Sequence, residues 1–237
     1  MGSEHIVSSF DNDLAELNHM VARLGGLAEQ QFAAAVEALE TRNTSNIDAI
    51  VEADKQLDKL EFELNERAIE VIARRSPMAK DLRRIIVALR VAGNLERIGD
   101  YAKNIAKRSR VIIEHEKSLG DNVSITRIAG LTQQMINQVL DAYATGDAEL
   151  AMDVWDRDMD VDQLHTSIFR EVLEQIGADS ERVSAGSQLL FVAKNIERIG
   201  DYATGIAEQI YFVKHGEFPS QTRPKADDSS SSAIDQS

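Results

Sequence analysis

The amino-acid sequence predicts an all-α protein built from two tandem, pseudo-symmetric three-helix bundles. The stretch Asn94–Ala102 returns almost unchanged at Asn195–Ala203, with a constant offset of 101 residues. A near-match of nine residues at that spacing indicates two copies of one domain-sized unit. Only three prolines occur in 237 residues, so long stretches rich in alanine, leucine, glutamate and isoleucine are free to be helical.

Three helices are predicted in the first half. Apolar residues recur at three- and four-residue steps over 11–41, which is the helical period. Residues 42–45 form a polar turn, and a second helix follows to about Ala73. Ser76-Pro77 favours the start of a third helix over 77–116, because a capping residue followed by proline is a common beginning of a helix.

The second half repeats this plan. A fourth helix is predicted over 124–144, and Gly146-Asp147 ends it and caps a fifth helix over 148–176. Residues 177–180 form the next turn, and a sixth helix covers 181–215. The two halves therefore have the same order of elements.

The predicted boundaries follow from these helices. The first repeat covers 1–116, a linker containing Gly120 covers 117–122, and the second repeat covers 123–216. Residues 217–237 are predicted to be a disordered tail, because from 219 onward the segment holds two prolines, four consecutive serines and no aromatic residue.

Composition excludes several classes of protein. The net charge of -14 argues against a general nucleic-acid binder, which would carry a basic surface. The chain has no cysteine, so disulfides, thiolate ligands and thiol nucleophiles are absent. No apolar run approaches the roughly 20 residues of a membrane span, and the polar N-terminus does not resemble a signal peptide. We therefore expect a cytoplasmic chain that does not insert into a membrane.

Pairs of acidic residues recur four times at a spacing of four. On a helix, residues four apart share a face, so both carboxylates of each pair point the same way. Like charges placed in this way destabilise a helix unless something compensates them. The eight residues are Asp54, Asp58, Glu96, Asp100, Asp158, Asp162, Glu197 and Asp201.

The pairs of the first half are placed symmetrically about a turn. Asp58 and Glu96 each lie 19 residues from Pro77, and Asp54 and Asp100 each lie 23 residues from it. In two antiparallel helices, residues equidistant from the turn face each other. The second-half pairs are likewise equidistant from the junction of residues 179 and 180. Four carboxylates are thus expected to converge in each repeat.

A bound cation is the first candidate for compensating such a cluster. Carboxylate oxygens suit Mg²⁺, Mn²⁺, Ca²⁺ or iron and disfavour a structural zinc site. Two other interpretations stay open: the acids pair with Arg97 and Arg198, or they are solvated. Gly99 and Gly200, within the repeated motif, either allow helices to approach closely or make room for the ion.

Two further features have alternative interpretations. Tyr101 and Tyr202 are expected to pack between helices rather than to catalyse. Arg74-Arg75 and Arg83-Arg84 make one end of the first hairpin basic, either as a solvated helix end or as a docking patch for an acidic partner.

The third helix has a second apolar stripe in addition to the one that a bundle requires. It is expected to bury against the other repeat, a dimer mate or a partner. The stripe consists of Val87, Val91, Leu95 and Ile98.

With these residues the chain resembles the PhoU family, the accessory regulators of the bacterial phosphate-specific transport system. The resemblance covers about residues 7–215. It is carried by Asp54 and Asp58, by the segment Ala73–Arg83, and by the two Glu-Arg-Ile-Gly-Asp motifs. It implies multinuclear sites for iron, manganese or magnesium at the eight acids named above.

The resemblance also implies what the protein does. It implies a cytoplasmic, often homodimeric adaptor between the nucleotide-binding subunit of a phosphate ABC transporter and the sensor histidine kinase of the phosphate regulon. Such an adaptor holds phosphate uptake and the starvation response down when phosphate is plentiful.

We favour a regulator that turns over no substrate, because the sequence shows no nucleophile–base pair and no phosphate-binding glycine loop. A metal-dependent enzyme, either a phosphohydrolase or an oxidase that uses the carboxylate clusters, is the alternative. A plain helical scaffold with salt-bridged acids is the third interpretation.

Overall fold

The computed structural model describes residues 2–115 and 123–220, with side chains for 10–114 and 124–220. All regular structure in these ranges is helical, and they contain no β-strand. The prediction of an all-α protein is confirmed.

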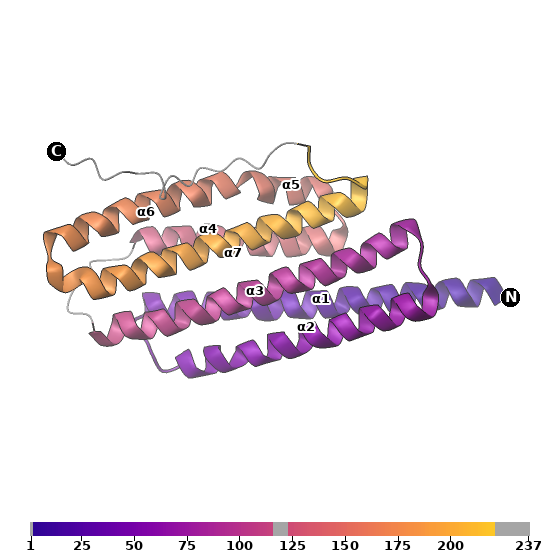
Figure 1. The fold of residues 1–237 in the computed structure, drawn as a ribbon, viewed down its shortest axis with the longest axis horizontal. Coiled ribbons are helices and arrows are strands. Elements are labelled where there is room, and N and C mark those ends of the chain that lie inside the picture. The colour runs from indigo at the N-terminus through magenta and orange to yellow at the C-terminus, as the bar shows by residue number, and fades with distance from the viewer. Residues whose placement is uncertain (1, 116–122, 221–237) are drawn as a thin grey trace.

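The first repeat contains three long helices that run antiparallel to their neighbours (Figure 1). They are α1 (Gly2–Glu40), α2 (Ile47–Arg75) and α3 (Ala79–His115). The second repeat lies beside the first in Figure 1 and has the same order of helices, with its middle helix in two pieces. Its elements are α4 (Val123–Thr145), α5 (Ala148–Asp156), α6 (Asp158–Ala178), a 3₁₀ turn η1 (Ser180–Arg182) and α7 (Val183–His215).

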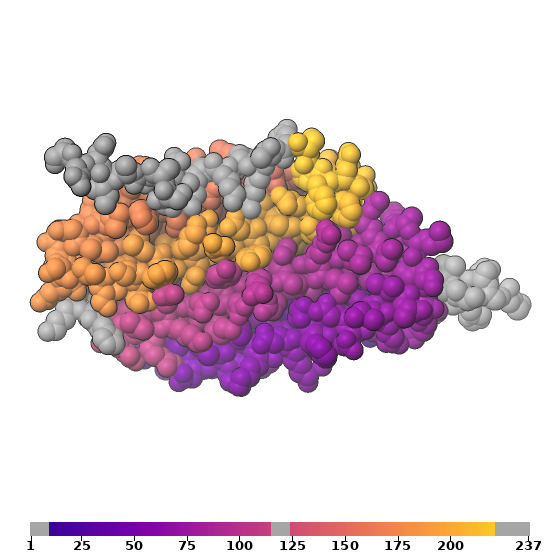
Figure 2. Space-filling model, in the orientation of Figure 1, coloured from indigo at the N-terminus to yellow at the C-terminus, as the bar shows by residue number. Residues whose placement is uncertain are grey.

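The two repeats pack against each other along α3 and α7, and also along α1 and α4. The second apolar stripe of the third helix is buried: Val87 and Leu95 are at most 1% exposed. α3 packs against α1, α2 and α7, so this stripe is covered within the chain and needs neither a dimer mate nor a partner. Figure 2 shows the two repeats as adjoining halves of one elongated body.

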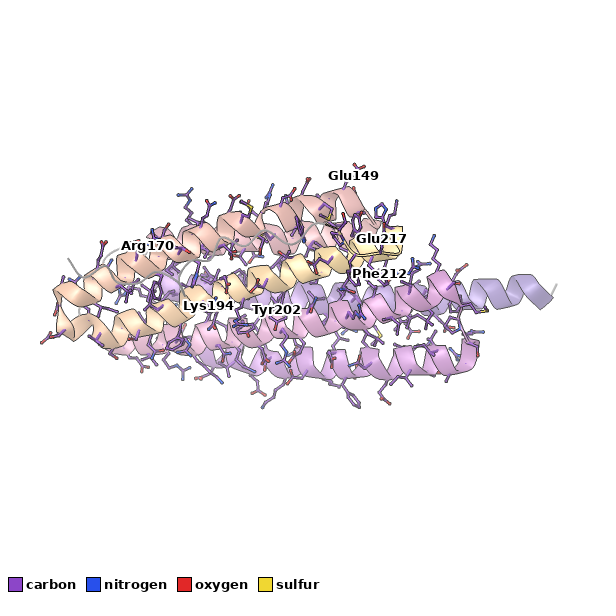
Figure 3. The ribbon with its side chains drawn as sticks, turned by 45° about the horizontal axis from the view of Figure 1, so that its top comes forward. Glu149, Arg170, Lys194, Tyr202, Phe212 and Glu217 are labelled. Atoms are coloured by element: carbon purple, nitrogen blue, oxygen red, sulfur yellow. The ribbon has the colours of Figure 1, made fainter. Side chains whose placement is uncertain are left out.

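Equivalent residues meet where α3 and α7 cross. The rings of Tyr101 and Tyr202, which are 101 residues apart, stack with centroids 5.8 Å apart. Figure 3 labels Tyr202 at this crossing. This contact confirms that both tyrosines pack between helices. The Arg108 guanidinium also lies over the Phe191 ring of α7, 4.3 Å from its centroid.

The predicted start of the third helix is wrong. Ser76 does not cap α3; it ends α2 in the left-handed region, with φ 46°, and its N–H donates to the Ile72 carbonyl. The residue before a proline is disfavoured in the right-handed helical region, so Pro77 ends one helix rather than beginning the next. Ala79, also with positive φ, then starts α3.

The predicted single fifth helix is also wrong, because the structure divides it at Arg157 into α5 and α6. The Asp160 N–H donates to the Arg157 carbonyl at 3.0 Å, an i→i+3 bond that tightens the turn. In a turn closed by such a bond, side chains three residues apart point to the same side of the helix. Trp155 and Asp158 are both buried, and both bond to α7 through Glu208 and Thr204 respectively.

Two predicted segments lie largely outside the described residues. The linker at 117–122 is one, and 221–237 of the predicted tail is the other. Within the described residues that follow α7, the Phe218 ring stacks on Phe212 with centroids 4.6 Å apart. No helix in the described ranges is both long enough and apolar enough to span a bilayer.

The repeated glycines differ between the repeats, which gives a first prediction. A Cβ at Gly99 would lie 2.4 Å from Leu57 Cδ1 and 2.9 Å from Gln31 Oε1, whereas one at Gly200 would make an ordinary 3.4 Å contact with Val161. Gly99→Ala should therefore lower the free energy of unfolding by about 1–2 kcal/mol through overpacking. Gly200→Ala should leave it unchanged or raise it by up to about 1 kcal/mol, because alanine is the better helix former.

Urea unfolding of both variants in chelator-containing buffer measures this difference, and Gly200→Ala serves as the matched control for Gly99→Ala. Equal effects of the two substitutions would show that the close α2–α3 contact at Gly99 does not limit side-chain size.

Candidate functional site

In the first repeat, a lysine occupies the centre of the predicted carboxylate cluster. Lys103 on α3 lies one turn after Asp100, and its Nζ donates to Asp100 Oδ1 at 2.6 Å. The same Nζ also donates to Asp54 on α2. The structure thus brings Asp54 and Asp100 together across the hairpin, and one ammonium group bridges them.

Lys103 stays charged in this position. Desolvation on its own would lower the pKa of its ammonium, but the hydrogen bonds to Asp100 and Asp54 raise that pKa to about 12. The Asp54 side chain is 8% exposed and the Lys103 side chain 19% exposed, so the ion pair is largely shielded from water. Removing either partner would therefore leave a shielded charge without compensation, which is destabilising.

The other two acids of the first repeat lie at the rim of this ion pair. The pKa of Asp58 is raised, first by partial desolvation and then by the charge of Asp54. Desolvation and the charge of Asp100 raise the pKa of Glu96, and Asp58 adds to the effect. The Arg97 guanidinium lies 3.1 Å from Asp100 and 3.5 Å from Glu96, so the predicted pairing with Arg97 occurs at this rim.

The second repeat has a threonine where the first has Lys103, since Thr204 is 101 residues further on. Its hydroxyl lies 3.2 Å from Asp158 Oδ1 and 3.0 Å from the Gly200 carbonyl. A hydroxyl carries no charge, so this position does not neutralise the cluster. Asp158, Asp162 and Glu197 are 1%, 3% and 5% exposed, so three of the four acids are deeply buried.

Glu197 is the most perturbed of these acids. Its Oε1 accepts from Lys194 at 3.0 Å, while its buried Oε2 has no hydrogen-bond partner among the described residues. Burial raises the pKa of Glu197 to about 7; the charges of Asp201 and Asp162 add to the rise, and Lys194 opposes it. A buried carboxylate oxygen without a partner is costly, and a cation beside it would remove that cost. Figure 3 labels Lys194 on α7.

The two clusters differ in how well they fit a metal ion. In the described ranges, no three histidine, aspartate or glutamate side chains are already arranged around one ion position. The first cluster does not fit as it stands, because the Lys103 ammonium lies between Asp54 and Asp100. The second cluster fits better: its donors are hard oxygens, and the unpartnered Glu197 Oε2 is among them.

Comparison with known proteins decides the family. The model of the PhoU domain matches the chain twice, over residues 21–109 and 125–210. The chain belongs to the PhoU family. A phosphate-specific transport system accessory protein PhoU homolog from Caulobacter vibrioides is 44% identical over 225 residues, which cover 95% of this chain and 98% of the relative. A homolog of the same name from Zymomonas mobilis is 42% identical, with 93% of each chain covered.

Solved structures agree with this assignment. The crystal structure of PhoU from Pseudomonas aeruginosa superposes with a TM-score of 0.85 at 32% identity, covering 88% of this chain and all of that one. Both PhoU-domain matches end close to the ends of α3 and α7. The match of the whole chain to PhoU proteins confirms the resemblance drawn from the repeated motif.

Sequence reasoning identified the acids of this PhoU-family chain but missed Lys103 and Thr204. Two signals were available. Lys103 lies three residues after Asp100 and therefore on the same helical face, and the offset of 101 places Thr204 opposite it in the other repeat. His165 also lies three residues after an acid of the second cluster, Asp162, and is 3% exposed on α6.

Proposed function

We propose that this protein is a regulatory accessory protein that restrains phosphate uptake and phosphate-starvation signalling by contact with other proteins. The observation that carries the proposal is the match to phosphate-specific transport accessory proteins over 95% of the chain, with both repeats included. Phosphate transport takes place in a membrane, and no helix in the described residues suits a membrane span. The protein would therefore act through a partner that is bound to the membrane.

The partners we propose are the nucleotide-binding subunit of a phosphate ABC transporter and the sensor histidine kinase of the phosphate regulon. Both lie at the cytoplasmic face, so we place this protein in the cytoplasm. We also propose that it acts as a homodimer and turns over no substrate. Sedimentation velocity of the full chain tests the dimer, and release of phosphate from esters by the metal-loaded protein would contradict the non-enzymatic role.

Deletion of the gene tests the regulatory role and gives a second prediction. In medium rich in phosphate, the deletion strain should take up phosphate faster than its parent and switch on a reporter of phosphate starvation. Both effects should disappear when the wild-type chain is supplied from a plasmid. Unchanged uptake and unchanged reporter activity in the deletion strain would refute the assignment.

We propose further that metal ions bind mainly to the second repeat. The residues that would hold them are Asp158, Asp162, Glu197 and Asp201, with iron, manganese or magnesium as the metal. A bound cation would supply positive charge that neutralises these carboxylates and ties α6 to α7. Support comes from the buried, unpartnered Glu197 Oε2 and from the uncharged Thr204 in the place of Lys103. The first cluster of Asp54, Asp58, Glu96 and Asp100 would hold metal only if Lys103 moved away.

A further inference from the structure

A cavity of about 400 Å³ lies where α3 begins and where α4 and α7 end. It is separate from both acidic clusters. Both repeats contribute to it: Lys80, Arg84 and Val87 come from α3, while Ile210, Val213 and Lys214 come from α7. The remaining lining residues are Asn18, Tyr143, Ala144, Thr145 and Gly146.

All the charged residues that line this cavity are basic. Lys80, Arg84 and Lys214 line it, and none of its lining residues is acidic. None of these three cations forms a salt bridge with any residue in the described part of the chain. The whole protein carries a net charge of -14, so a cluster of three cations without acidic partners is unusual for this composition. Lys80 also sits in the first turn of α3, where the helix dipole disfavours a cation.

Arg84 and Tyr143 line this cavity together. Burial raises the pKa of the Tyr143 phenol, and the positive charge of Arg84 opposes this rise. The Tyr143 hydroxyl itself is 3.1 Å from Asn18 Oδ1, to which it donates. This bond fixes the ring as a wall of the cavity. Val87, Ile210 and Val213 supply apolar surface beside it.

A neighbouring arginine holds the two repeats together at this point. Arg83 stacks over the Phe212 ring, 5.1 Å from its centroid, and thereby joins the start of α3 to the end of α7. Figure 3 labels Phe212 at this end of α7. A ligand in the cavity would therefore contact both repeats close to an existing link between them.

We propose that this cavity binds a small phosphate-bearing molecule, with the phosphoryl oxygens on Lys80, Arg84 and Lys214 and the rest of the molecule on the apolar wall. Arginine and lysine side chains are the usual donors to phosphate oxygens. The volume falls within the range of about 300–1,000 Å³ that is typical of small-molecule pockets. All three cations are exposed, so a dissolved ligand can reach them. This inference does not depend on the metal sites or on the regulatory role.

Isothermal titration of the full-length protein tests the proposal with two probes, ADP and inorganic phosphate, each in low-salt buffer. The variant carrying Lys80→Gln, Arg84→Gln and Lys214→Gln should bind the probes more weakly than the wild type. We expect the affinity to fall about tenfold for each cation that contacts the ligand. The control variant carries Arg23→Gln, Lys107→Gln and Arg170→Gln. It has the same change in net charge at exposed positions outside the cavity, and it should bind like the wild type.

The two probes separate the possible sources of the phosphoryl group. Binding of ADP but not of inorganic phosphate shows that the second phosphoryl group or the nucleoside is needed, and equal binding of both probes shows that one phosphoryl group is sufficient. Either result supports the proposal. It is overturned if the wild type binds neither probe, or if both triple variants lose binding equally. Matching thermal unfolding curves for the two variants exclude misfolding as the cause of a difference.

Discussion

Lys103→Thr is expected to increase the number of metal ions that the chain binds, by opening the first repeat to metal. In the wild type, Lys103 bridges Asp54 and Asp100 and supplies the positive charge that a cation would otherwise supply. The substitution reproduces Thr204 of the second repeat, where three of the four acids are buried and Glu197 Oε2 has no hydrogen-bond partner in the described part of the chain. The first repeat should then hold metal as the second is proposed to do.

Equilibrium dialysis against Mn²⁺ after metal-free purification, followed by elemental analysis, measures this change. Lys107→Thr removes an exposed lysine from the same helix one turn further on and should leave the metal content unchanged. The reciprocal variant Thr204→Lys should lower the metal content, because it places an ammonium among the acids of the second repeat.

The outcomes separate two ideas. If the double variant Glu96→Ala and Asp100→Ala loses as much metal as Glu197→Ala and Asp201→Ala, then Lys103 does not exclude metal from the first repeat. If neither wild type nor Lys103→Thr binds metal, the metal proposal fails in both repeats. The regulatory proposal would survive that second result, since it depends on protein contacts.

Asp13→Asn is expected to lower the free energy of unfolding by about 2–3 kcal/mol, because it removes a buried charge that three arginines share. Asp13 on α1 is 6% exposed. Its Oδ1 accepts from Arg67 at 2.7 Å and from Arg74 at 2.9 Å, and its Oδ2 accepts from Arg75 at 2.8 Å. All three arginines belong to α2, so this single carboxylate ties the first two helices together.

The effect of this substitution should depend on pH. Burial alone would raise the pKa of Asp13, but the hydrogen bond from Arg75 and the charges of Arg74, Arg75 and Arg67 outweigh burial and hold the pKa below its ordinary value of 3.8. A carboxyl whose pKa is lower in the folded state contributes its full stability above its unfolded value. That contribution is lost as the pH falls through the lower, folded-state value.

Thermal unfolding of wild type and Asp13→Asn between neutral pH and pH 3 measures this dependence. The difference between them should be constant from neutral pH to about pH 5 and should shrink below about pH 4. Asp48→Asn removes a salt bridge to Arg110 in which the aspartate side chain is 88% exposed, so it should change stability by less than about 1 kcal/mol. A similar loss in both variants would mean that burial at Asp13 adds nothing.

These arginines also answer a question that the sequence left open. Arg74-Arg75 was expected to be either a solvated helix end or a docking patch. In the structure both residues are engaged with Asp13. Arg83 and Arg84 take different roles, one stacked on Phe212 and the other beside the Tyr143 cavity.

The sequence by itself determined the internal repeat, the helical class and the opposition of the acids across the first hairpin. Each of these features can be recognised from the positions of residues along the chain. A constant offset gives the repeat, apolar residues at three- and four-residue steps give the helices, and equal distances from Pro77 give the pairing of Asp54 with Asp100. Short-range rules were less reliable at the ends of helices, as Ser76 and Arg157 show.

Only the tertiary structure decided which charges are already compensated. Lys103 pairs with both Asp54 and Asp100 because α2 and α3 hold them within reach of one ammonium, while the second repeat buries Glu197 with one oxygen unpartnered among the described residues. Lys80, Arg84 and Lys214 surround one cavity only because α3 of one repeat packs along α7 of the other. The strength of a charge interaction depends on distance and desolvation, and both are set by packing between helices that lie far apart in the sequence.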